Sequence, residues 1–193
     1  MFVKNKLSLE KSPLKKIDVK EICRGRRVVL LQKIFETHDG EKIFKDVINF
    51  GEAVAIVPMI DDDHVVLIRQ YRAPIERWIH EIPAGKVESG EDIIDAVKRE
   101  LIEETGYMPR EIIYLKSIYT APGYSDEIIH IFIAKDLVYV GSKPEKGEII
   151  ETKIYRLSDA IDIVLKEDPS DVKTLVGLLL AKENLKRIID DKS

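Results

Sequence analysis

Residues 85–107 read GKVESGEDIIDAVKRELIEETGY, and this stretch decides the fold and the chemistry that we expect. Its apolar residues recur at steps of three and four over residues 91–105, which predicts an amphipathic helix with one buried face. Gly106 predicts the end of that helix, because glycine adopts left-handed backbone at little cost. Ser89 and Asp92 predict a capping box at its beginning. The apolar positions are Ile93, Ile94, Val97, Leu101 and Ile102.

Three glutamates share the acidic side of this predicted helix. Glu100 and Glu104 are one turn apart and Glu103 lies beside them, so we expect their carboxylates to converge off the helix surface. Mg²⁺ takes oxygen ligands and would relieve their mutual repulsion, while keeping coordination sites for phosphate oxygens and water. The alternative is a solvated acidic face paired with neighbouring basic residues. The glycines that bracket the helix favour the metal site.

Length and composition limit the classes of protein to consider. The 193 residues with 45% hydrophobic content suit one domain, or one compact domain with an N-terminal appendage. The net charge of −4 gives no electrostatic reason to expect nucleic acid as a partner. The N-terminal segment is too polar for a signal peptide and no apolar run reaches transmembrane length, so we expect a cytoplasmic protein that binds no membrane. Cys23 stands alone and is expected to be buried.

The residues ahead of the helix predict strands. Residues 17–50 mix β-branched and charged side chains around a turn at Asp39 and Gly40, which indicates a small antiparallel unit. A sheet of so few strands buries little apolar surface by itself. We therefore expect this unit to pack on the main domain or on a second subunit. Residues 53–60 and 64–72 predict a second hairpin, more apolar and therefore more central.

The residues after the helix complete the predicted architecture. Strands are expected at 111–120 and 128–137 and through Ile154. Two helices should follow, capped by Ser158 and Ser170. The whole pattern is a mixed sheet with helices on its faces, an α+β fold of the α/β/α sandwich kind.

The spacing within residues 85–107 resembles the Nudix box, GX5EX7REUXEEXGU with U apolar or bulky, at every fixed position. Segments 81–92 and 120–127 are similar to those of bacterial and archaeal ADP-ribose pyrophosphatases. Pro122 lies fifteen residues beyond Tyr107, where that subgroup carries a proline. The resemblance implies Mg²⁺-dependent hydrolysis of the diphosphate of ADP-ribose to AMP and ribose 5-phosphate.

The same resemblance implies how the chain is organised. Residues 1–50 would be an N-terminal β extension that mediates a homodimer, and residues 51–193 would be a Nudix hydrolase domain with a mixed sheet. The small-molecule partner would be a nucleoside diphosphate derivative such as ADP-ribose.

The resemblance also assigns the metal ligands. Mg²⁺, with Mn²⁺ as a substitute, would be held by the backbone carbonyl of Ala84 and the carboxylates of Glu100 and Glu104. Glu103 would be an additional ligand or would orient water. Arg99 is expected to anchor the helix carboxylates or the Gly85 loop by charge-assisted hydrogen bonds.

The water-activating base is left open among three residues. The resemblance places it in an acidic loop late in the chain, where Glu148 fits best and Glu145 could substitute. Lys146 and Gly147 interrupt the acids of that loop, and Glu103 is the third candidate.

Substrate contacts are expected from two further regions. By the resemblance, Arg72 and Glu127 would face the substrate, although Arg72 could also be an ordinary surface charge on a strand. Arg26 and Arg27 would stack on adenine or bind phosphate from the partner subunit.

Three rival functions remain compatible with these residues. One is a Nudix pyrophosphatase for a nucleotide sugar, a dinucleotide or an oxidised nucleotide, since the box handles only metal and diphosphate. Another is a non-catalytic nucleotide sensor on the same fold, which would have little need for all three helix glutamates. The third is an RNA-processing enzyme, which would need a basic groove.

Overall fold

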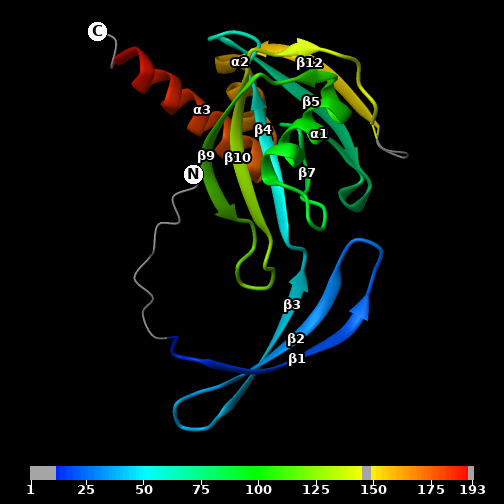
Figure 1. The fold of residues 1–193 in the computed structure, drawn as a ribbon, viewed down its shortest axis with the longest axis vertical. Coiled ribbons are helices and arrows are strands. Elements are labelled where there is room, and N and C mark those ends of the chain that lie inside the picture. The colour runs from blue at the N-terminus through cyan, green and yellow to red at the C-terminus, as the bar shows by residue number, and fades with distance from the viewer. Residues whose placement is uncertain (1–11, 145–148, 191–193) are drawn as a thin grey trace. The chain divides into compact units, whose positions relative to one another are not determined.

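The structure, a computed structural model, describes residues 12–144 and 149–190, with side chains as far as residue 187 at the C-terminal end. It divides the chain into two compact units, which Figure 1 shows as ribbons. The described parts of the first unit are residues 12–50 and 121–126, and those of the second are 51–120, 127–144 and 149–190.

The first unit is a three-stranded antiparallel sheet in the order β1-β2-β3. The predicted turn is confirmed: the amide of Thr37 donates to the carbonyl of Glu41 at 2.9 Å, and Gly40 has a φ of 84°. Residues 121–126 join this unit, because the amide of Ile48 donates to the carbonyl of Tyr124 at 2.8 Å. The strands are β1 (Lys15–Arg24), β2 (Val29–Glu36) and β3 (Lys42–Asn49).

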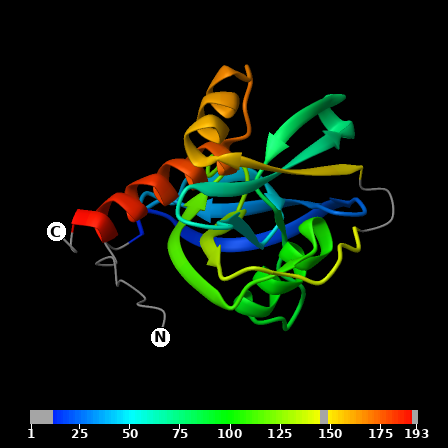
Figure 2. The ribbon, with the colours of Figure 1, turned by 90° about the horizontal axis from the view of Figure 1, so that it is seen from above.

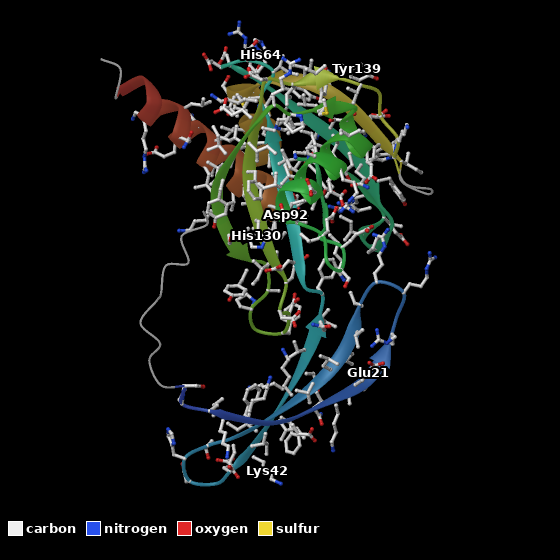
Figure 3. The ribbon with its side chains drawn as sticks, viewed as in Figure 1. Glu21, Lys42, His64, Asp92, His130 and Tyr139 are labelled. Carbon is white, nitrogen blue, oxygen red and sulfur yellow. The ribbon has the colours of Figure 1, made fainter. Side chains whose placement is uncertain are left out.

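Strand β1 is exposed along its whole length. The expectation that Cys23 is buried is therefore wrong, because this residue lies on that strand. A sheet of three strands has no second layer within this unit to cover it. Glu21 of β1 and Lys42 of β3 are marked in Figure 3.

The second unit contains a mixed sheet and an antiparallel sheet, as expected for an α+β fold. In the mixed sheet, β4 and β10 run parallel, with Ile128 opposite Glu52 and Ala134 opposite Pro58. The mixed sheet contains β7 (Ala84–Lys86), β4 (Glu52–Pro58), β10 (Ile128–Lys135) and β9 (Glu111–Tyr119), in that order. The antiparallel sheet contains β12 (Ile150–Arg156), β5 (His64–Arg72) and β6 (Arg77–Glu81). Short elements are η1 (Ala73–Ile75), β8 (Tyr107–Met108) and β11 (Val138–Tyr139).

The predicted hairpin between residues 53–60 and 64–72 is wrong. Both strands form, but β4 lies in the mixed sheet and β5 in the antiparallel sheet, with one isolated bridge between Met59 and Val65. The reason is burial: β4 is buried from Ala53 to Pro58, so its backbone groups need strand partners on both edges. It finds them in β7 and β10.

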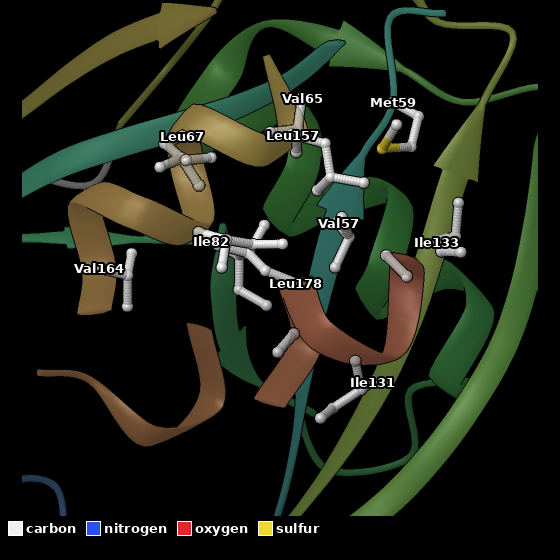
Figure 4. Close-up of a cluster of buried hydrophobic side chains, with 14 of the residues drawn as sticks. Val57, Met59, Val65, Leu67, Ile82, Ile131, Ile133, Leu157, Val164 and Leu178 are labelled. Atoms are coloured by element: carbon white, nitrogen blue, oxygen red, sulfur yellow. The ribbon is translucent and has the colours of Figure 1, made fainter. Parts of the chain in front are cut away.

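Helices cover both faces of the strands, which confirms the predicted α/β/α sandwich. Figure 2 shows α1 on one side of the strands and α2 and α3 on the other. Figure 4 shows the cluster of buried side chains under α2 and α3, which includes Val57, Leu67, Ile131 and Leu178. A second cluster packs Val97 and Leu101 of α1 against the other face. The helices are α1 (Ile93–Thr105), α2 (Leu157–Lys166) and α3 (Val172–Asp190).

The helix ends differ in part from expectation. Gly106 ends α1 in left-handed backbone at φ 79°, as predicted, and its amide donates to the carbonyl of Ile102 at 2.8 Å. The beginning is capped by Asp92 alone, whose carboxylate accepts from the amide of Ile94 at 2.8 Å, and not by a capping box from Ser89. Asp92 is the residue with extended backbone immediately before the helix, so its side chain reaches the unpaired amides (Figure 3).

The predicted serine caps of the later helices are also wrong. Ser158 falls inside the first turn of α2, where its hydroxyl donates to Asp159 at 3.3 Å. The residue before α3 is Asp171, and its carboxylate accepts from the amide of Thr174 at 3.0 Å, so it takes the place expected for Ser170. Of the helices in the part of the chain that the structure describes, none has the length and apolar character needed to cross a bilayer.

Candidate active site

Helix α1 places two glutamates against the backbone of β7. Glu104 is only 3% exposed, and its Oε2 accepts from the amide of Ala84 at 3.0 Å. The carboxylate of Glu100 lies over Gly85, since a Cβ atom built there would be 2.0 Å from its carboxyl carbon. Because Glu100 and Glu104 are one turn apart, both carboxylates lie along one short stretch of backbone. The strand stays in place through pairing with β4, where Gly85 is opposite Val54.

Arg99 ties the acidic side of α1 to the loop ahead of it. Its Nε and Nη2 donate to the two carboxylate oxygens of Glu91 at 2.8 and 2.9 Å, and Nη2 also donates to the carbonyl of Lys86 at 3.0 Å. Its Nη1 donates to Glu100 at 2.6 Å and to Glu103 at 3.3 Å. The expectation that Arg99 anchors the helix carboxylates or the Gly85 loop is confirmed, and Arg99 contacts both.

These contacts shift the pKa values of both partners. The hydrogen bond from Arg99 holds the pKa of Glu91 below its ordinary value, with its charge adding to the effect. The pKa of Arg99 is raised, chiefly by the hydrogen bond to Glu91 and further by Glu100. Both groups are therefore charged at neutral pH. Their ion pair links helix α1 to the loop ahead of it.

The expected convergence of three carboxylates on one point is not seen. Within residues 12–144 and 149–190, no three acidic, histidine or cysteine side chains are grouped so that they could hold a metal ion. The reason is that Arg99 draws Glu100 and Glu103 toward itself, while Glu104 accepts from the Ala84 amide.

A smaller set of candidate metal ligands still fits a hard divalent cation. It consists of the carboxylates of Glu100 and Glu104 and the carbonyl of Ala84. This carbonyl is part of the peptide bond that joins Ala84 to Gly85. All of these donors are oxygens. Mg²⁺ is commonly held by one or two carboxylates together with substrate phosphates and water, so a cluster of three side chains is not required.

Arg72 lies at the end of β5 and is half-buried, in an ion pair with a buried glutamate. Its Nε and Nη2 donate to the two carboxylate oxygens of Glu81 at 2.6 and 2.7 Å. The hydrogen bond with Glu81 is the main reason why the pKa of Arg72 is raised, and the charge of Glu104 contributes. Of the glutamates of α1, Glu104 is therefore the one whose charge acts on Arg72.

The remaining predicted residues lie in several places. Glu127 precedes β10 and is half-buried, with the hydroxyl of Thr120 donating to it at 2.5 Å. Arg26 and Arg27 are exposed on the connection between β1 and β2, in the first unit. Glu145 and Glu148 lie outside the described residues.

The residues on either side of positions 145–148 are anchored next to predicted site residues. The amide of Lys143 donates to the carbonyl of Glu103 at 3.0 Å. The carbonyl of Ile149 accepts from the amide of Tyr71, beside Arg72, at 3.2 Å.

Sequence reasoning missed the partners of Arg72. Glu81 is 1% exposed and is also contacted by Lys173 of α3, which is itself buried. A signal for Glu81 was present, since a charged residue at an inward position of a strand, next to Ile82, requires a buried partner. The chain gives no such signal for Lys173, which lies 92 residues away from Glu81.

Comparison with known proteins identifies the class that this fold and site define. The NUDIX domain matches residues 49–176, more than half of the chain, so the chain belongs to that family. Proteins of this family that act on ADP-ribose generally require a divalent metal ion.

Individual relatives resemble the chain over nearly its full length. It is 34% identical over 173 residues to the ADP-ribose pyrophosphatase of Bacillus subtilis (strain 168), covering 89% of this chain and 92% of that protein. It is 35% identical over 170 residues to the methanol dehydrogenase activator of Bacillus methanolicus, covering 85% and 90%. The crystal structure of an ADP compounds hydrolase superposes with a TM-score of 0.79 at 27% identity, covering 90% of this chain and 94% of that one.

Proposed function

We propose that this protein is an ADP-ribose pyrophosphatase, which hydrolyses ADP-ribose to AMP and ribose 5-phosphate with Mg²⁺. The observation that carries the proposal is the position of Glu100 and Glu104 along the backbone of Ala84 and Gly85. The names of the Bacillus subtilis relative and of the solved ADP compounds hydrolase support the choice of substrate.

The proposed roles of the residues follow from their charges. Glu100, Glu104 and the carbonyl of Ala84 would hold Mg²⁺, or Mn²⁺ in its place. Bound there, the metal would neutralise diphosphate oxygens and lower the pKa of a coordinated water. Arg99 donates to Glu100 and is itself held by its ion pair with Glu91, so it keeps the helix glutamates in position.

Substrate and water would be handled by residues around this centre. Arg72 would add positive charge next to the diphosphate, where anionic oxygens otherwise repel the attacking water. Among the residues that the structure describes, Glu103 is the candidate for orienting or deprotonating that water. Glu145 and Glu148 remain candidates as well. Glu127 would line the substrate.

We also propose a homodimer formed through the first unit. Strand β1 is an edge strand of its sheet and exposes the apolar side chains of Ile17, Val19 and Ile22. Unpaired edges and exposed apolar side chains favour association with a second chain. Arg26 and Arg27 would then reach the nucleoside half of the substrate bound by the partner subunit.

The experiment that tests the function is a cleavage panel with Mg²⁺. ADP-ribose would be compared with ADP-glucose, diadenosine polyphosphates, NADH and 8-oxo-dGTP, with products separated by chromatography. The proposal expects AMP and ribose 5-phosphate from ADP-ribose at the highest kcat/KM. Better cleavage of another compound would keep the metal chemistry and change the substrate, whereas cleavage of none would favour the sensor alternative.

A further inference from the structure

An ion-pair network behind Arg72 joins two consecutive strands to a helix that lies 92 residues further along the chain. Glu81, at the end of β6, accepts two hydrogen bonds from Arg72 of β5 and one from Lys173 in the first turn of α3. Lys173 also donates to Asp171 at 2.9 Å. The side chains of Glu81 and Lys173 are 1% and 10% exposed, whereas that of Arg72 is 33% exposed. The network therefore runs from the interior to Arg72, which is its most solvent-accessible member.

The interior end of the network is fixed by the helix cap. Oδ2 of Asp171 accepts from the amide of Thr174 at 3.0 Å and from its hydroxyl at 2.6 Å. The same hydroxyl oxygen accepts from the amide of Ile82 at 2.9 Å, next to Glu81. Because Thr174 is fully buried, the start of α3 and the end of β6 form one rigid support.

The geometry of the pair decides which edge of Arg72 remains available. Glu81 occupies the side-on edge of the guanidinium, formed by Nε and Nη2. Within the described residues, Nη1 donates to no other group. The end-on edge formed by Nη1 and Nη2 is therefore the one left for a second anion, and this fork matches the spacing of two phosphate oxygens.

The charges explain why Lys173 belongs to the arrangement. A buried carboxylate paired with one arginine would cancel the charge of that arginine. Lys173 shares the negative charge of Glu81, and Asp171, at the positive N-terminal end of α3, partly offsets Lys173. Burial alone would raise the pKa of Glu81, but Arg72 and Lys173 outweigh it and lower that pKa.

We infer that Glu81 is a positioning residue, supported by Lys173, that holds Arg72 with its end-on edge toward a phosphate group of the substrate. The inference rests on the proposed function, because it takes the substrate to be a nucleoside diphosphate derivative. A network that served only the stability of the fold would need no exposed, unused edge on Arg72.

A double-mutant cycle separates the two roles. We would measure kcat and KM for the wild type, Glu81→Gln, Arg72→Ala and the double variant, on whichever diphosphate compound the wild type cleaves. Glu81→Gln is expected to lower kcat/KM by about 100-fold, the scale of a misplaced group. In the Arg72→Ala background it should cost less than about twofold, because there is no arginine left to position. Equal losses in both backgrounds would overturn the inference.

Two further variants keep the cycle interpretable. Glu151→Gln removes the exposed partner of Arg69 on the same strand as Arg72, and it should leave kcat/KM unchanged. If Glu81→Gln does not fold because Lys173 becomes uncompensated, Glu81→Gln combined with Lys173→Met removes both buried charges together, and the cycle is run with that pair.

A readout without turnover distinguishes this inference from the proposed function. The Nε–H of Arg72 should give a slowly exchanging NMR signal in the wild type, identified by its absence in Arg72→Lys. The signal should be lost in Glu81→Gln and kept in Glu151→Gln. If no compound is cleaved, the proposed function fails. The NMR signal still decides whether Glu81 holds Arg72. A signal that is unchanged in Glu81→Gln would refute the inference.

Discussion

The carboxylate of Glu100 lies directly on Gly85: a Cβ atom at position 85 would be 2.0 Å from the carboxyl carbon of Glu100. A methyl group at position 85 would therefore force the flexible end of the Glu100 side chain to move away from β7. The glycine of the box is thus required by the close approach of a helix carboxylate to the strand backbone, and not by an unusual backbone angle.

Gly85→Ala is expected to displace Glu100 and lower kcat/KM by about 100-fold, since a ligand moved by about 1 Å is badly placed for catalysis. Stability should fall by less than about 1 kcal/mol, because the atoms in the way are the flexible end of a side chain that can move aside. Activity assays and urea unfolding would measure both. Gly123→Ala is the control for stability, because nothing lies within 4 Å of a Cβ there. Unchanged activity in Gly85→Ala would contradict the site.

Glu104→Gln should abolish Mg²⁺-dependent turnover, by about 1000-fold or more, while the fold is kept. The amide oxygen of glutamine can still accept from the Ala84 amide, so only the charge is lost. Steady-state kinetics across a Mg²⁺ titration, with circular dichroism, would check this. Glu111→Gln, at an exposed position on β9, is the matched control. A wild-type rate at saturating Mg²⁺ would sink the metal assignment.

Asp92→Ala should destabilise the protein by about 1 kcal/mol, because it removes the side chain that caps α1. Ser89→Ala should change stability by less than about 0.5 kcal/mol, as its side chain does not cap the helix. Chemical denaturation of both variants would rank them. The reverse order would restore the capping box.

Stability at acid pH should depend on Glu91. Its pKa is lowered in the folded protein by the hydrogen bond from Arg99, so the stabilising effect is fully present above the ordinary carboxyl value of 4.5. It is lost as the pH falls below that value and through the lowered folded pKa. Glu91→Gln should therefore be less stable than wild type at pH 7, and the gap should narrow toward pH 3. Thermal unfolding across this range would show it, and a constant gap would speak against the assignment.

The protein should be a dimer at micromolar concentration by light scattering, and Ile22→Lys should shift it toward monomer. Ile22 is 53% exposed on β1, and a lysine there would place like charges across the proposed interface. Leu165→Lys, at a comparably exposed position on α2, should leave the dimer intact. A monomeric wild type would refute the proposed assembly.

Local pattern was enough to predict α1, its end at Gly106 and the strands on either side of it. Periodicity and glycine conformation are properties of neighbouring residues, so they can be read along the chain. The ion pairs of Arg99 were predictable for the same reason, since its partners lie nearby in the sequence, on α1 and in the loop just ahead of it.

Strand partners and most caps were not predictable in this way. The sequence placed residues 53–60 and 64–72 as strands, but which edges they pair with depends on β10 and β12, far along the chain. The caps of α1 and α3 depended on which of several nearby polar residues lies just before the first helical residue.

By itself, then, the sequence determined helix α1, the fold class and the family, because these rest on the order and spacing of nearby residues. Only the tertiary structure decided that Glu100 lies on Gly85, that β4 and β5 separate into two sheets, and that Glu81 and Lys173 hold Arg72. Each of these depends on how separate elements pack in space, where burial forces charged and backbone groups to find partners that local spacing does not specify.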